Sequence, residues 1–263
     1  MTTPLTLSMA RSRALPFAGH GPLLKVTVPL CFLVIFMALF EFTPLDPMVS
    51  SWFFDADTNS WPFRDNFFVE DVLHKGAKYL AILVGLWALT VFLLSFKKIS
   101  LRPLRRKALY LFLAMALSSG IIGALKYASK THCPWDLDLY GGKEHYIHLL
   151  KPFPEGACPG KCFPGGHASC GFCFFALYFI FKESSRRRGV VGLWIGFLAG
   201  NTVGLAQVAR GAHFLSHHLW TGVLVWFVCL GLYHYGFSGN LSENTLGQPS
   251  PTGLSERGEA HTR

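Results

Sequence analysis

Residues 107–126 read KALYLFLAMALSSGIIGALK, an apolar run of 18 residues between two lysines with no charged side chain inside it. An α-helix rises 1.5 Å per residue, so a run of this length is close to the roughly 20 residues that cross the ~30 Å hydrocarbon layer of a bilayer. The stretch therefore predicts a membrane-spanning helix over residues 108–125. The fold depends on how many such runs the chain contains.

Five further runs of this kind occur along the chain. The six predicted spans cover residues 26–40, 79–96, 108–125, 165–181, 189–209 and 219–237. Only 15% of the residues are charged and 51% are hydrophobic, whereas soluble domains average about 25% charged residues. A soluble protein with six buried core helices is the alternative, which the near absence of an amphipathic period disfavours. The sequence predicts an all-α fold, a six-transmembrane-helix bundle.

This bundle is expected to occupy residues 23–237, between an N-terminal tail (1–22) and a disordered C-terminal tail (238–263). Residues 97–107 carry six positive charges and no acid, and residues 182–188 carry four against a single acid. Short loops rich in Lys and Arg face the cytoplasm, so both tails are expected inside. We expect a multi-pass protein of a bacterial inner membrane, with the opposite side facing the periplasm. The net charge of +9 then reflects topology and not nucleic-acid binding.

Three polar clusters fall on the predicted outer side. They are Lys126 with Lys130, Pro164-Gly165-Gly166-His167, and Arg210 with His213 and His217. Each has a plain alternative, such as a snorkelling anchor lysine or a Pro-Gly turn that starts a helix. Ionisable residues that converge from several loops at a membrane boundary nevertheless indicate a functional site.

This set of groups suits phosphoryl transfer. Cations and the free N–H groups of a helix start hold phosphate oxygens, and Gly165 and Gly166 allow an anion to approach the backbone. One histidine is available as the nucleophile and another as the acid for the leaving alkoxide. Arg210 and His213 lie on one face if their helix continues. No cofactor or metal is expected, because no carboxylate accompanies the zinc-like spacing of His213 and His217.

The clusters resemble the three signatures of the type 2 phosphatidic acid phosphatase superfamily, six-helix integral membrane phosphatases related to vanadium haloperoxidases. The family pattern is Lys, six residues, Arg-Pro; then Pro-Ser-Gly-His; then Ser-Arg, five residues, His, three residues, Asp. The matching stretches here are Lys126 to Pro134, Pro164 to His167, and Ala206 to His217. They depart from the pattern at Cys133, Gly165, Ala206, Gln207 and His217.

By this resemblance, His213 is expected to form a phosphohistidine and His167 to protonate the leaving alkoxide. Lys126 is expected to hold phosphate. His217, in the place of the family aspartate, is expected to orient the nucleophilic imidazole without supplying a negative charge.

Two cations are expected to stand in for the arginines that the pattern has lost. Arg210 lies about 60° around a helix and ~4.5 Å along it from Gln207, a distance that a long arginine side chain covers. Lys130, one helical turn beyond Lys126, is the weaker substitute for the arginine missing at Cys133.

The resemblance implies a metal-independent phosphatase that acts at the outer membrane surface on a lipid phosphate monoester or diphosphate held in the bilayer. Two alternatives stay open, a lipid phosphotransferase and a catalytically impaired protein that binds phosphate lipids. A haem b carrier is disfavoured because His167 and His213 lie at the membrane boundary.

Three of the seven cysteines, Cys133, Cys158 and Cys162, lie in predicted outer segments. One disulfide can form among them in an oxidising compartment, and zinc binding by the three is the rival. We favour Cys133 with Cys162, a pair that would tie the first motif to the second. The aromatic-rich residues 52–68 are expected at the lipid headgroups as part of a lipid-contacting wall.

Overall fold

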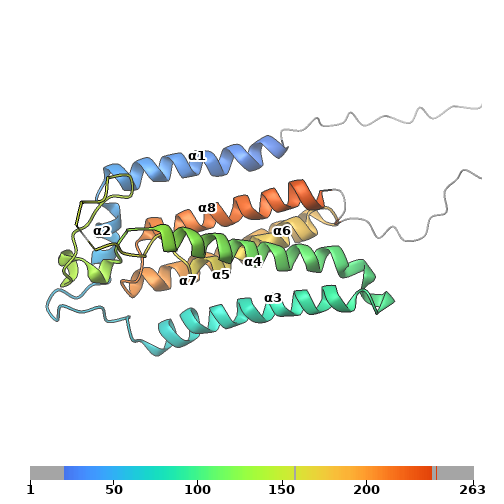
Figure 1. Cartoon of the computed structure of the whole chain (residues 1–263), viewed down its shortest axis with the longest axis horizontal. Coiled ribbons are helices and arrows are strands. Elements are labelled where there is room, and N and C mark those ends of the chain that lie inside the picture. The colour runs from blue at the N-terminus through green and yellow to red at the C-terminus, as the bar shows by residue number, and fades with distance from the viewer. Residues whose placement is uncertain (1–20, 157, 239–240, 242–263) are drawn as a thin grey trace, which may run out of the picture.

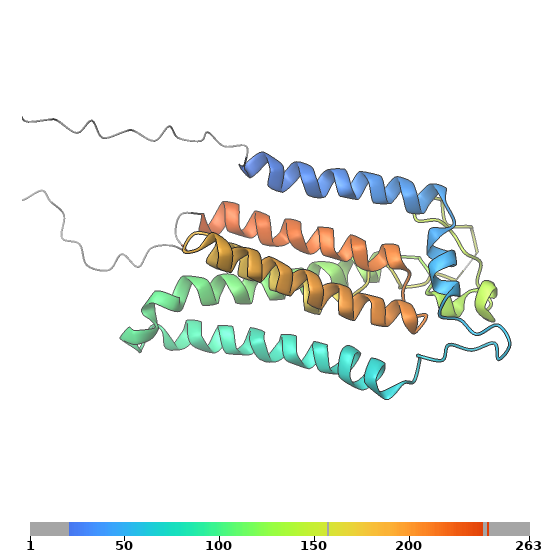
Figure 2. The same cartoon turned by 180° about the vertical axis from the view of Figure 1, so that it is seen from behind.

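The computed structural model describes residues 21–156, 158–238 and 241. This part of the chain is all-helical, and its long helices run side by side along one axis (Figures 1 and 2). They are α1 (Gly21–Phe42), α3 (Ala77–Leu94), α4 (Arg105–Ala128), α7 (Arg186–Ala209) and α8 (Leu215–Leu232). Apart from residues 21–22, 238 and 241, the two predicted tails lie outside the described residues.

Shorter elements complete the fold. The stretch Ala168–Phe181 consists of α5 (Ala168–Phe172), the 3-10 turn η5 (Cys173–Phe175) and α6 (Ala176–Phe181). The others are α2 (Leu45–Ser51), the π-helix η1 (Phe68–Gly76), the 3-10 helices η2 (Ile99–Leu104), η3 (Pro134–Asp136) and η4 (Asp138–Tyr140), and the π-helix η6 (Tyr233–Phe237). Helix α2 and the loops around it gather at one end of the bundle, called here the α2 end (Figure 1).

Several helices have the length and composition of membrane spans. Four qualify singly, namely Phe68–Leu94, Ile99–Ala128, Arg186–Ala209 and Leu215–Phe237. A fifth is obtained if Val26–Phe42 and Leu45–Ser51, which meet at 75°, form one bent span. The apolar segment Ala168–Phe181, which covers most of the predicted fourth span, is shorter than these. The chain therefore has the helices of a multi-pass membrane protein, and the count of six spans stays a prediction.

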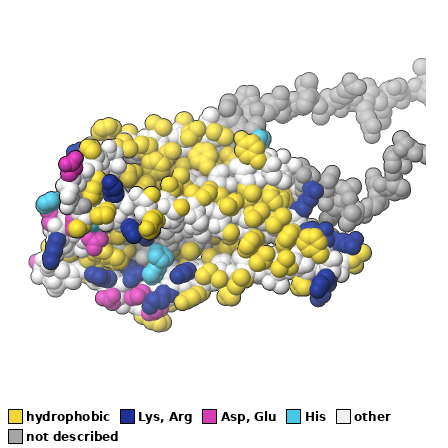
Figure 3. Space-filling view, viewed as in Figure 1, with side chains coloured by type: hydrophobic (Ala, Val, Ile, Leu, Met, Phe, Trp, Pro, Cys, Tyr) yellow, Lys and Arg dark blue, Asp and Glu magenta, His cyan; other side chains and the backbone are white. Residues whose placement is uncertain are grey.

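The surface agrees with a membrane setting. Hydrophobic side chains cover the middle of the face in Figure 3, whereas Lys and Arg gather at the end away from α2 and both signs of charge occur at the α2 end. Helix α3 is an example, because Leu83 and Trp87 are 63% and 59% exposed along it. Apolar side chains exposed along a whole helix in this way suit a surrounding of lipid.

A row of glycines on α7 allows α5 and α6 to pack against it. Gly192, Gly196 and Gly200 recur every four residues, so they share one face of the helix. A Cβ atom at Gly200 would lie 2.2 Å from the ring of Phe172, and one at Gly196 would lie 2.6 Å from the backbone nitrogen of Phe175. Small residues let helix backbones approach closely, and this approach places the residues that precede α5 beside the end of α7.

The core lies among α4, α5, α6 and α8. Tyr110, Phe172, Phe179 and Val225 are all buried in one apolar cluster there. The hydroxyl of Tyr110 donates to the carbonyl of Cys229 at 2.8 Å, which joins α4 to α8. This hydrogen bond satisfies a polar group that would otherwise be costly to bury.

A second apolar cluster closes the α2 end. Trp61, Leu137, Tyr140 and Phe214 are buried in it, and the ring centroids of Trp61 and Tyr140 lie 5.1 Å apart. Trp52, by contrast, is 70% exposed. The expectation of a lipid-contacting wall over residues 52–68 is therefore wrong for Trp61, because that ring packs beneath the loops that follow α4.

Asp46 attaches α2 to the start of α8. Its Oδ1 accepts from the N–H of Ser216 at 2.9 Å, and its Oδ2 accepts from the Ser216 hydroxyl at 2.5 Å. Asp46 and Ser216 are both buried. A carboxylate at a helix start satisfies free N–H groups and suits the positive end of the helix dipole, so this contact holds the connection between α7 and α8 in place.

The glycine row predicts a test of the packing. Gly200→Ala should lower the free energy of unfolding by about 1–3 kcal/mol, because its methyl group would overlap the buried Phe172 ring. Gly120→Ala on α4 is the matched control, since a Cβ there meets no atom within 4 Å. Thermal unfolding in detergent measures both variants. Equal stability of the two would mean that α5 does not pack closely on α7.

Candidate active site

The three polar clusters come together at the α2 end of the bundle. Helix α4 ends there, α5 begins there, and the connection from α7 to α8 lies between them (Figures 1 and 2). The segments that carry the three predicted clusters therefore lie at the same end of the bundle.

Lys126 faces the glycine loop. It lies in the last turn of α4, and a Cβ atom at Gly166 would be 3.7 Å from its Cδ and 3.9 Å from its Nζ. The ammonium group therefore lies close to the backbone of Gly166, where an anion would contact both.

Gly165 has a structural role in the same loop. Its N–H donates to the carbonyl of His217 at 3.1 Å, and its own carbonyl accepts from the Thr221 hydroxyl at 3.0 Å. These two bonds fasten the loop to α8. The N–H of Gly165 is therefore engaged, which leaves Gly166 as the glycine that borders Lys126.

His213 lies in a turn and not on a helix. Helix α7 ends at Ala209, and Gly211 adopts a left-handed backbone with φ of 73°. A Cβ atom at Gly211 would also lie 2.5 Å from the ring of Trp61. The turn therefore requires glycine for two reasons, its left-handed backbone and the close approach of Trp61. Arg210 and His213 were expected to share one helix face only if the helix continued, and this condition is not met, because α7 ends at Ala209, before both residues.

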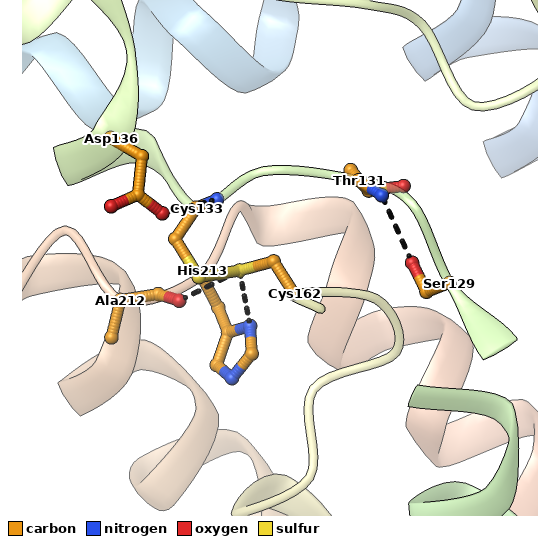
Figure 4. Close-up of a disulfide and its surroundings, with 7 residues drawn as sticks. All are labelled: Ser129, Thr131, Cys133, Asp136, Cys162, Ala212 and His213. Carbon is orange, nitrogen blue, oxygen red and sulfur yellow. Dashed lines mark hydrogen bonds between the residues drawn. A yellow bond between two sulfur atoms is a disulfide. The ribbon is translucent and has the colours of Figure 1, made fainter. Parts of the chain in front are cut away.

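The disulfide between Cys133 and Cys162 packs against His213 (Figure 4). Cys162 is fully buried, its Sγ lies 3.3 Å from Nδ1 of His213, and it also lies 3.1 Å from the carbonyl oxygen of Ala212. A disulfide sulfur carries no proton, so in the contact with His213 the imidazole is the donor. With its proton on Nδ1, the neutral ring has its lone pair on Nε2, the nitrogen on the far side from the disulfide.

Burial governs the charge of His213. The residue is only 3% exposed. Burial, followed by the neighbouring His217 and the positive charge of Lys126, holds the pKa of His213 well below its ordinary value of 6.5. The imidazole is therefore neutral at physiological pH, as a nucleophile must be.

His217 lies near His213 without bonding to it. The ring centroids are 5.8 Å apart with an angle of 66° between the planes. Nδ1 of His217 is buried and has no hydrogen-bond partner among the described residues. The orienting contact expected from His217 is thus not formed here, and the sulfur of Cys162 is the group that faces Nδ1 of His213.

His74 belongs to the site and was not predicted. Its Nε2 lies 2.6 Å from Nε2 of His167, and its Nδ1 lies 2.9 Å from NH1 of Arg210. Because a guanidinium only donates, Nδ1 of His74 accepts, and its Nε2 carries the proton that is donated to His167. His167 then holds its own proton on Nδ1, an atom that is buried and has no partner in the described part of the chain.

Arg210 fixes this pair of histidines. Besides the bond to His74, its Nε donates to the carbonyl of Arg64 at 2.8 Å, and its NH2 lies 3.6 Å from Oε2 of Glu70. It also donates to Oε1 of Gln207 at 3.4 Å. Arg210 was expected to take the place of the phosphate-binding arginine that the family pattern has at position 207. These contacts do not show that role, because the guanidinium is directed at His74 and its neighbours.

A local feature of the helix explains why His74 escaped prediction. The sequence predicts a membrane span only from residue 79, but the helix already begins at Phe68 with the π-helical turn η1, which runs into α3. Such turns are rare and occur often at functional sites. The available signal was the spacing of Glu70 and His74, which are four residues apart immediately before an apolar run.

Lys130 lies elsewhere. Helix α4 ends at Ala128, and Ser129 is extended, so Lys130 does not follow Lys126 by one helical turn. Its Nζ lies 5.6 Å from the centre of the Phe153 ring and borders a separate cavity of about 320 Å³. The expected placement of Lys130 one helical turn beyond Lys126, as a substitute for the arginine missing at Cys133, is therefore wrong.

A family model adds an independent finding. The model described as PAP2 superfamily matches residues 107–240, just over half of the chain. This stretch contains Lys126, Gly166, His167, Arg210 and His213. Comparisons with curated proteins and with solved structures found no match. The match covers most of the helices that carry these residues. It shows that the chain belongs to the PAP2 superfamily.

Proposed function

We propose that this protein is a membrane lipid phosphatase that hydrolyses the phosphate monoester or diphosphate of a lipid through a phosphohistidine at His213, without a metal ion. The site would face the periplasm of a bacterial inner membrane. Members of the PAP2 superfamily are phosphatases, which supports a hydrolase of phosphoric esters in general. The lipid substrate and the mechanism are inferred from the site.

The observation that carries the mechanism is the contact between the disulfide and His213. Donation from Nδ1 to the sulfur of Cys162 at 3.3 Å leaves the lone pair on Nε2. The depressed pKa of His213 keeps that lone pair free of a proton. Lys126 contributes positive charge beside Gly166, where phosphate oxygens would bind.

The reaction then proceeds in two steps. Nε2 of His213 attacks phosphorus, and the bond to the leaving oxygen breaks as that oxygen receives a proton from His167. Water next attacks the phosphohistidine, His167 takes a proton from the water, and the N–P bond breaks to release phosphate. The first step uses the imidazolium form of His167, which carries a proton on both ring nitrogens and which a bound phosphate dianion favours. In that form Nε2 of His167 no longer accepts from His74.

We propose that His74 is the positioning residue for His167. It donates to Nε2 of His167 while Arg210 holds its other nitrogen. This chain of bonds selects the tautomer of His167 whose proton is on Nδ1. Because Nδ1 has no partner among the described residues, that N–H can donate a hydrogen bond to a substrate oxygen.

An apolar groove supports a lipid as the substrate. A cavity of about 430 Å³ lies along α3 and α4 and is bordered by Gly166 and Lys78 as well as by Leu86, Phe112 and Gly123. Gly166 also borders Lys126. When a lipid phosphate binds beside Gly166, its hydrocarbon tail can thus lie in this apolar channel. A water-soluble phosphate ester does not need such a channel.

One observation favours a second candidate, a catalytically impaired protein that binds phosphate lipids. Cys133 and Gln207 stand where the family pattern has arginine, and Arg210 is occupied by His74, Glu70 and the carbonyl of Arg64. Lys126, beside Gly166, and Lys78, which borders the same cavity as Gly166, are then the cations left near the glycine loop. Loss of two cations would weaken stabilisation of the transition state.

The direct test is phosphate release from a panel of lipid phosphates by purified protein in detergent with EDTA present. Wild type should release phosphate, and His213→Ala should lose activity by about 10³-fold or more because the nucleophile is gone. His145→Ala is the matched control, since that histidine is on the surface with an 85% exposed side chain.

Activity that survives His213→Ala would refute the mechanism. Binding of lipid phosphates without release by wild type would favour the binding protein. Release that appears only when an acceptor lipid is added would favour a lipid phosphotransferase.

The role of His74 has its own test. His74→Leu should lower kcat by about 10²-fold with little change in KM, because His167 loses its fixed tautomer. His74→Gln should recover part of kcat, since an amide oxygen can accept from Arg210 while the amide nitrogen donates to His167. The pH profile of kcat should shift in the Leu variant. Equal damage by Leu and Gln would indicate a merely structural role.

A further inference from the structure

We propose that reduction of the Cys133–Cys162 disulfide creates a zinc site from these two cysteines and His213, and that zinc bound there blocks the nucleophile. The metal site stands on the geometry of the three residues. Its effect on activity rests on the proposed function of His213.

The three ligand atoms are already gathered. Sγ of Cys133, Sγ of Cys162 and a ring nitrogen of His213 all lie within 4.8 Å of one another, and this is the only such group of His, Cys, Asp and Glu among the described residues. Tetrahedral zinc, with Zn–S of about 2.3 Å and Zn–N of about 2.0–2.1 Å, places a sulfur and a nitrogen about 3.5 Å apart. Nδ1 of His213 lies 3.3 Å from Sγ of Cys162.

The backbone would hold the two cysteines close after the disulfide opens. The N–H of Cys162 donates to the carbonyl of Thr131 at 2.9 Å. The N–H of Gly160 donates to the carbonyl of Lys130, also at 2.9 Å. These bonds pair the segment before Cys133 with the segment before Cys162. The N–H of Cys133 donates to Oδ2 of Asp136 at 3.3 Å (Figure 4). The site is therefore largely preorganised, which limits the entropy lost on binding metal.

The chemistry balances with a thiol reductant. Two reductant thiols open the disulfide, which yields two cysteine thiols and the disulfide of the reductant. Zinc then replaces both thiol protons, and two thiolates offset the charge of the ion in the neighbourhood of Lys126. Two sulfurs and one nitrogen leave the fourth zinc position for water.

Zinc would reverse the tautomer that the disulfide imposes. With the disulfide intact, Nδ1 of His213 carries the proton and Nε2 carries the lone pair. With zinc on Nδ1, the proton of the neutral ring must move to Nε2. The nitrogen assigned to attack phosphorus then has no lone pair, so metal binding and phosphoryl transfer exclude each other.

The experiment uses the full chain in detergent, reduced with a dithiol that is then removed without air. Titration with Co²⁺, whose thiolate charge-transfer band reports sulfur ligation, should show one site in the reduced protein that is absent in the oxidised protein. Zinc should displace the Co²⁺. His213→Ala should weaken binding by about tenfold or more, and Cys162→Ser should abolish it. Cys158→Ser is the control, because Cys158 is free and exposed.

A second readout does not depend on variants that fold poorly. Zinc should protect Cys133 and Cys162 of the reduced wild type from alkylation, as mapped by mass spectrometry, and should leave Cys158 reactive. Equal binding by reduced and oxidised protein, binding unchanged by His213→Ala, or no protection would each overturn the site. Zinc should also inhibit phosphate release only after reduction. If the protein releases no phosphate at all, the binding and protection results still decide on the metal site.

Discussion

One covalent bond organises the proposed site. The disulfide between Cys133 and Cys162 joins the segment that leaves α4 to the segment that leads into α5, and His213 packs against its sulfur from the turn between α7 and α8. Three separate stretches of chain therefore depend on one contact. Without it, the tautomer of His213 and its distance from the glycine loop would be set only by the surrounding loops.

The departures from the family pattern form a consistent set when they are considered in space. Cysteine replaces the arginine of the first motif, and that cysteine supplies half of the disulfide that faces His213. Histidine replaces the aspartate of the third motif, and the ring nitrogen that an aspartate would orient is turned to sulfur instead. Arg210, which follows the missing third-motif arginine, supports His167 through His74. Where the family pattern has charged side chains, this chain has a disulfide beside His213 and hydrogen bonds through His74 to His167.

Much of the architecture could be predicted because apolar runs bounded by charges are a strong local signal. Helix α4 (Arg105–Ala128) covers the stretch predicted at 108–125, and α7 (Arg186–Ala209) covers that predicted at 189–209. The pairing of Cys133 with Cys162, favoured from the sequence over the other pairs among the three outer cysteines, is present in the structure.

What sequence reasoning missed depends on where helices stop and on contacts between distant segments. The left-handed turn at Gly211 separates Arg210 from His213, and the end of α4 at Ala128 separates Lys130 from Lys126. Partnership of His74 with His167 joins residues 93 positions apart. No local pattern encodes such a pair, because it arises only when η1 and the start of α5 are brought together by packing.

In the proposed mechanism, His213 carries the phosphoryl group during turnover. Rapid acid-free quenching of wild-type protein with a lipid phosphate, followed by digestion and mass mapping at high pH, tests it most directly, since phosphohistidine survives alkali. We expect one phosphoryl group on the peptide that contains His213, attached to that residue. A phosphoryl group on another residue, or turnover without any labelled histidine, would contradict it.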